Sequence, residues 1–169
     1  MRATTQWILG LVLAITGTGC GKQASAPTTV SSSATALVQP ALTAWQQGDK
    51  AAATARFTET DWSRVPLFPS NSPLRLTEEE FIKLSVAERQ SKSPEMMSQL
   101  DELKRLAGAV AQAGREAAAK GNATQARKYF VALRQCGTAL DSSDRMRLVQ
   151  LVGQGMKKAA EAELGKLGQ

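Results

Sequence analysis

Histidine is absent from this sequence of 169 residues, and only two cysteines, Cys20 and Cys136, are present. Without histidine, the Ser-His-Asp and Cys-His nucleophilic systems cannot be built, and the most common metal ligand in proteins is missing. Two isolated cysteines also cannot supply the paired CxxC ligands of a structural zinc site. We therefore expect no bound metal, no cofactor and no enzymatic activity.

Phosphate-binding loops are lacking as well. The sequence contains no GxxxxGK[ST] motif, and Gly153 and Gly155 form an isolated pair inside a predicted helix rather than a glycine-rich turn after a strand. Carboxylate-only hydrolysis needs two acids that converge in a cleft, but the acids here are scattered along the chain. Non-catalytic functions are therefore favoured.

Aromatic residues are scarce at 5% of the chain, whereas alanine is abundant. Alanine loses no side-chain entropy when it enters a helix, so this bias favours helices over strands. The length suffices for one domain with a modest core. The composition predicts an all-α fold.

Basic residues outnumber acidic ones, 21 to 15, for a formal net charge of +6. The charges are interspersed, with no basic stripe or nucleic-acid-reading motif, so the sequence argues against a nucleic-acid partner. Attraction to an anionic envelope polymer or membrane surface stays open as an alternative, through three basic pairs: Lys104-Arg105, Arg127-Lys128 and Lys157-Lys158.

The N-terminus has the layout of a secretory signal, with one positive charge at Arg2, an apolar run over residues 7–15 (WILGLVLAI) and small residues before Cys20. The run is too short for a transmembrane helix, which needs about twenty apolar residues. Gly17-Thr18-Gly19-Cys20 resembles the lipobox of bacterial lipoproteins. The resemblance implies removal of residues 1–19 and acylation of Cys20 with palmitate-type chains. Ordinary cleavage near Ala26 and an uncleaved short anchor are the alternatives.

Residues 22–35 (KQASAPTTVSSSAT) contain almost no large apolar side chain and cannot bury enough surface to offset the entropy of ordering. We interpret residues 20–35 as the acylated cysteine and a flexible tether, followed by a helical domain over residues 36–169. The protein is accordingly expected to be exported and held on a membrane of the cell envelope, on its periplasmic face or at the outer membrane.

Helical spacing and capping signals divide this domain. A hairpin is expected up to residue 60, with a break at Gly48-Asp49, followed by a proline-rich loop at about residues 61–75 that Trp62, Val65, Leu67 and Phe68 attach to the core. Thr77 and Glu80 form a capping box for the next helix. Longer helices are expected from Ser93-Pro94 to residue 120, from 123 to 140, and from 148 to 164, the last capped by residues 141–144.

One face of the longest predicted helix carries apolar or small residues at intervals of three or four. This spacing indicates a single buried stripe. Its members are Met97, Leu100, Leu103, Ala107, Val110, Gly114 and Ala117.

Two segments look alike, residues 44–57 (AWQQGDKAAATARF) and 117–130 (AAAKGNATQARKYF). In each, a glycine is followed by Asp or Asn, then by alanine and phenylalanine at matching distances. The pattern resembles the second half of a tetratricopeptide repeat, in which a small residue lets two helices approach and an aromatic side chain fills the space between them. The resemblance implies packing roles for Ala53, Phe57, Gly114, Ala117, Ala126 and Phe130, with Leu133 beside them. An irregular helical bundle is the alternative.

Cys136 lies near the apolar stripe of its predicted helix, where a lone thiol behaves as a small buried hydrophobe. Together these features suggest a non-catalytic, membrane-tethered envelope lipoprotein that mediates protein-protein interaction or scaffolding. Its expected partners are the membrane, through acylated Cys20, and an unidentified envelope protein.

Overall fold

The computed structural model describes residues 36–168, so the predicted signal peptide, Cys20 and the tether lie outside the described part. The described chain is all-α, and its hairpins pack around one core. Its elements are α1 (Gln39–Gln46), α2 (Lys50–Glu59), the 3-10 turn η1 (Pro73–Arg75), α3 (Glu78–Lys83), α4 (Val86–Ala119), α5 (Ala123–Leu140) and α6 (Arg147–Lys166).

The α1–α2 and α4–α5 hairpins turn in the same way. Gly48 and Gly121 both adopt positive φ, of 80° and 75°, which a glycine tolerates without steric cost. The following residue, Asp49 or Asn122, accepts a hydrogen bond from the backbone N–H three positions on and so caps the next helix. The sequence likeness of the two segments thus corresponds to one shared turn.

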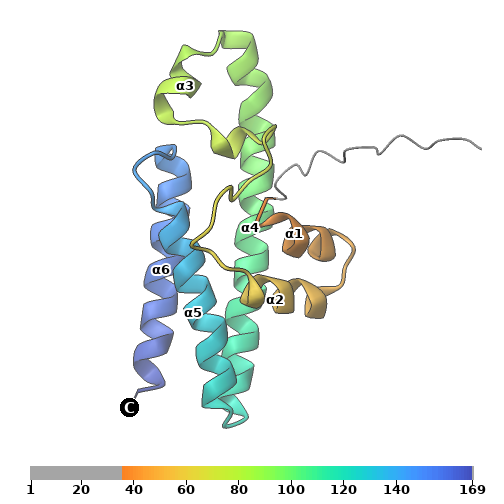
Figure 1. Ribbon diagram of the computed structural model, residues 1–169, viewed down its shortest axis with the longest axis vertical. Helices are drawn as coiled ribbons and strands as arrows, with labels where there is room; N and C mark the ends of the chain where they lie inside the picture. The colour runs from red at the N-terminus through yellow and green to blue at the C-terminus, as the bar shows by residue number, and fades with distance from the viewer. Residues whose placement is uncertain (1–35, 169) are drawn as a thin grey trace, which may run out of the picture. The chain divides into compact units, whose positions relative to one another are not determined.

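Helix α4 is the longest element, and α5 and α6 pack against it (Figure 1). The α1–α2 hairpin lies on the other side of α4 from α6 and crosses α4 instead of running along it. The two similar hairpins therefore do not stack side by side as in a regular repeat array. The arrangement is an irregular helical bundle built from hairpins.

The predicted helix start at Ser93-Pro94 is wrong. Helix α4 begins eight residues earlier, where Ser85 and Glu88 form a capping box, and Pro94 lies inside the helix. Proline removes one backbone donor from the interior of a helix, and the Ser93 hydroxyl bonds the Arg89 carbonyl oxygen at 2.7 Å nearby.

The prediction that Met97 belongs to the buried stripe is also wrong, because Met97 is 45% exposed whereas its neighbour Met96 is only 4% exposed. A stripe that starts at Met96 and continues through Leu100, Leu103 and Ala107 alternates steps of four and three residues. That alternation keeps successive side chains on one helix face better than the repeated steps of three from Met97. The remaining core positions of α4 are Leu106, Val110 and Gly114.

The proline-rich loop is attached to the core by buried Trp62, Leu67 and Phe68, as predicted, but Val65 is 79% exposed and that prediction is wrong. The loop also bonds the backbone at the start of α1: the N–H of Leu37 donates to the Pro66 carbonyl oxygen at 3.0 Å. Backbone bonding of this kind fixes the loop without requiring every apolar side chain to turn inward.

The sequence predicts that residues 141–144 cap helix α6, and this prediction is wrong. The N-cap of α6 is Met146, which offers no capping side chain, and Glu78 of α3 accepts a hydrogen bond from the Arg147 N–H at 3.0 Å instead. The capping box of Thr77 and Glu80 in α3 is confirmed. Helix α3 thus satisfies one free donor of a helix far away in the sequence.

Candidate functional site

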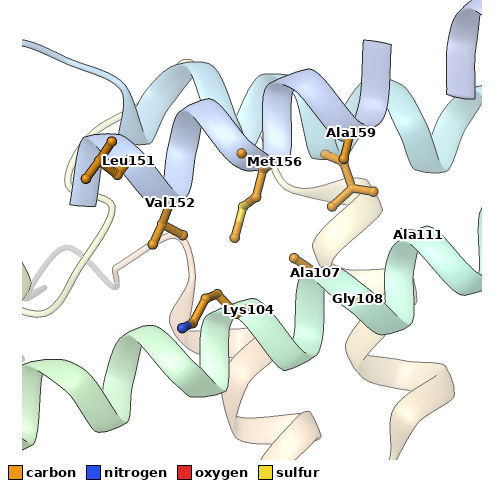
Figure 2. Close-up of a pocket in the computed structure, with 10 residues that line it drawn as sticks. Lys104, Ala107, Gly108, Ala111, Leu151, Val152, Met156 and Ala159 are labelled. Carbon is orange, nitrogen blue, oxygen red and sulfur yellow. The ribbon is translucent and has the colours of Figure 1, made fainter. Parts of the chain in front are cut away.

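A groove of about 460 Å³ lies between α4 and α6 (Figure 2), and Leu133 of α5 is also among its lining residues. Val152 and Met156 point into it from α6, facing Lys104 and Ala107 on α4. The lining is almost entirely apolar; the remaining lining residues are Gly108, Ala111, Leu151, Gly155 and Ala159.

The groove is open because small residues recur on both of its walls. Gly108 and Ala111 lie on one face of α4, and Gly155 and Ala159 lie four residues apart on one face of α6. A Cβ atom added at Gly108 or Gly155 would meet no heavy atom within 4 Å. Neither glycine is therefore required for packing within the chain, and together they leave the groove wide enough for an external side chain.

Close helix packing positions the α6 wall. At the crossing of α5 and α6, a Cβ atom added to Gly153 would lie only 2.6 Å from the carbonyl oxygen of Gly137. Asp141, at the end of α5, reinforces this crossing by accepting hydrogen bonds from Gln154 at 2.7 Å and Lys157 at 3.1 Å. These bonds are the main reason that the pKa of Asp141 is lowered.

The α4 wall is positioned by Phe130 of α5, which is 1% exposed and packs against Gly114. A Cβ atom at Gly114 would lie 2.7 Å from Phe130 Cζ, so the glycine makes room for the ring. Beyond the groove, Arg115 of α4 reaches Glu163 of α6 at 3.5 Å. The two walls are therefore held apart by α5 and joined by an ion pair at one end.

The structure places the predicted packing residues in two groups. Ala53 and Phe57 lie in the core around the α1–α2 hairpin, where the Phe57 ring packs on Trp62 with centroids 4.7 Å apart. The others belong to α4 and α5: Gly114, Ala126, Phe130 and Leu133 are buried, and Ala117 is half-buried. Only Leu133 also lines the groove.

The groove was not predicted from the sequence, because the sequence does not show which helix, if any, each glycine faces. Gly153 and Gly155 looked equivalent in the sequence, yet Gly153 contacts α5 and Gly155 lines open space. Side chains two positions apart in an α-helix point about 200° away from each other, so only one residue of such a pair can face a given neighbouring helix. Small residues at Gly155 and Ala159, together with Gly108 and Ala111, were the available indication.

Of the residues that the structure describes, 36–168, Lys104 is the only charged one that lines the groove, and it bonds Asp101 on its own helix at 2.6 Å. This hydrogen bond lowers the pKa of Asp101. Cys136 is buried in the core, and loss of hydration raises the pKa of its thiol, which keeps it uncharged and a poor nucleophile. The chemistry that the groove lining offers is therefore burial of an apolar surface.

Replacing Gly155 or Gly108 by alanine is expected to raise the free energy of unfolding by about 1 kcal/mol each. Both glycines lie inside helices, where alanine loses less backbone entropy, and both have open space for a methyl group. Urea unfolding followed by circular dichroism measures the change. A loss of stability in either variant would show that the groove is closed in the folded protein.

Among residues 36–168, no three His, Cys, Asp or Glu side chains are grouped closely enough to hold a metal ion. No helix of this described part is both long and apolar enough to cross a bilayer. Comparison with known proteins returns nothing similar: no family model matches the sequence, and no curated protein or solved structure matches it significantly.

Proposed function

We propose that this protein is a non-catalytic lipoprotein, tethered to a membrane of the cell envelope, whose helical domain binds a partner protein in the groove between α4 and α6. The observation that carries the proposal is the groove itself, which is apolar and is open because glycines and alanines line both walls. Such a surface on a water-soluble domain is typical of an interaction site.

The occupant that best fits this groove is an amphipathic helix of the partner. Helices α4 and α6 flank it and α5 lies behind it, so a fourth helix would complete a bundle. Glycine and alanine at intervals of three or four residues allow helix axes to approach closely. Leu151, which is 49% exposed at the groove, would be covered by such a helix. Lys104 at the α4 wall favours an acidic residue on the partner.

The tether rests on the sequence alone. The apolar run of residues 7–15 and the small residues before Cys20 indicate export and acylation, and residues 20–35 would let the domain stand away from the bilayer. In cell fractionation the protein should be found with membranes, and a Cys20→Ser variant should lose this association. An unmodified Cys20 in the intact mass of the mature protein would contradict the anchor.

Site-specific photo-crosslinking in cells tests the groove. A benzophenone side chain at position 111, inside the groove, is expected to give a discrete adduct with one protein. The same group at Lys128, which lines a separate hollow between α2 and α5, is the control and should give none. A second probe at position 151, also in the groove lining, covers the case in which position 111 is poorly placed. Equal adducts at positions 111 and 128, or no adduct at either groove position, would overturn the proposal.

A further inference from the structure

Arg145 lies in the turn between α5 and α6 and is unusual for an arginine, because its side chain is only 12% exposed. Its Nε atom is fully buried and has no hydrogen-bond partner among the described residues. The guanidinium carbon lies 5.8 Å from the centre of the Phe68 ring, and the Asp144 carboxylate is 4.0 Å from Nε, beyond hydrogen-bond distance. A buried charged donor without an acceptor requires an explanation.

The backbone of Arg145 is held by hydrogen bonds, whereas its Nε–H has no hydrogen-bond partner among residues 36–168. Its N–H donates to the Ser142 carbonyl oxygen at 3.1 Å, and its own carbonyl oxygen accepts a hydrogen bond from Gln150 at 2.7 Å. These two bonds fix where the side chain starts. Phe68 then supports the guanidinium group on one side. These contacts give the Arg145 guanidinium group a defined position.

Arg145 lines a cavity of about 500 Å³ between the proline-rich loop and the α5–α6 turn. Arg64 of the loop and Arg134 of α5 line the same cavity, as do the carboxylates Asp61 and Asp144. With three positive and two negative side chains, the lining carries a net formal charge of +1. The buried ring of Trp62 adds an apolar wall.

The two carboxylates are hydrogen-bonded by serines, and the arginines act on them only through charge: Asp144 forms an ion pair with Arg145 at 4.0 Å, and Arg64 contributes to the lowered pKa of Asp61. Asp61 accepts hydrogen bonds from the Ser63 hydroxyl at 2.6 Å and from the Ser63 N–H at 3.2 Å. A hydrogen bond from Ser142 is the main reason that the pKa of Asp144 is lowered. The acids thus stabilise their own turns, and the guanidinium groups keep donors available for a ligand.

We propose that this cavity binds a phosphate group, with Arg145 as the main ligand and Arg64 and Arg134 at the rim. A guanidinium group donates paired N–H···O bonds to phosphate, and the several oxygens of a phosphate can serve more than one arginine at once. The cavity is larger than a phosphate ion, so its apolar wall would hold an attached organic group. This site is separate from the groove between α4 and α6 and is independent of the function proposed for it.

Nuclear magnetic resonance of the arginine Nε–H groups tests the proposal in the mature chain, residues 20–169, with Cys20→Ser to exclude acyl chains. Inorganic phosphate, added at constant ionic strength against chloride, is expected to shift the Arg145 Nε–H signal saturably. Arg145→Lys keeps the charge but removes the paired donors, so it should weaken binding about tenfold or more. Arg127→Lys, at an exposed position of α5, is the matched control and should bind as the parent does.

A second variant covers the case in which Arg145→Lys disturbs folding. Arg134 is exposed on α5, and Arg134→Gln should weaken phosphate binding about two- to fivefold without altering the fold. Glycerol phosphate and vesicles containing phosphatidylglycerol distinguish the source: binding of the soluble ester indicates a small phosphorylated molecule, and binding of vesicles alone indicates a lipid head group. A linear shift that chloride reproduces, or equal affinity in all variants, would overturn the proposal.

Discussion

Replacing Phe130 by alanine is expected to lower the free energy of unfolding by about 3–5 kcal/mol. The ring is 1% exposed and lies in the space that Gly114 opens between α4 and α5, so its removal leaves a cavity that the two helices cannot easily close. Urea unfolding followed by circular dichroism gives the value. A loss below about 1 kcal/mol would mean that the ring is not a core residue.

A double-mutant cycle provides the control for this contact. Gly114→Ala alone should destabilise the protein, because the added Cβ would lie 2.7 Å from Phe130 Cζ. In the Phe130→Ala background the two closest neighbours are gone and only Tyr129 Cβ remains, at 3.2 Å, so the same change should cost much less. Additive effects of the two substitutions would contradict the contact, since only residues in contact are expected to couple.

Gly153→Ala is expected to destabilise the protein by about 1–3 kcal/mol, although alanine is the better helix former. The added Cβ would lie 2.6 Å from the Gly137 carbonyl oxygen and 2.8 Å from the Asp141 nitrogen, and both of these are backbone atoms that a side-chain rotation cannot move. Helices α5 and α6 would have to separate.

Thermal and urea unfolding of Gly153→Ala should be compared with Gly165→Ala in the same helix. Gly165 has no neighbour within 4 Å of an added Cβ, so its substitution tests helix propensity alone. An unchanged or higher stability for Gly153→Ala would show that α5 and α6 do not cross closely at Gly137.

Local signals in the sequence predicted the α1–α2 and α4–α5 turns and the start of α3. The pairs Gly48-Asp49 and Gly121-Asn122 act through φ and a capping side chain, which are properties of a few adjacent residues. The capping box at Thr77 is local in the same sense. The Ser85–Glu88 box is also local, but Pro94 follows it inside α4, at a position where proline usually marks a helix start or end.

Contacts between distant segments could not be predicted in this way. The cap that Glu78 provides for α6, the different roles of Gly153 and Gly155, and the buried position of Arg145 all depend on how helices meet. One helix sequence is compatible with several neighbours, and no periodicity specifies which glycine faces a partner. The groove between α4 and α6 follows from such contacts and appears only in the folded chain.

Filling the groove is the most direct test of the proposed binding function. Gly155→Leu places a side chain in the open space of the groove, whereas Gly165→Leu adds the same side chain to the same helix outside the groove lining. With the benzophenone probe at position 111, Gly155→Leu is expected to abolish the crosslinked adduct while the protein stays folded, and Gly165→Leu should leave the adduct unchanged. An undiminished adduct in a folded Gly155→Leu variant would contradict binding in the groove.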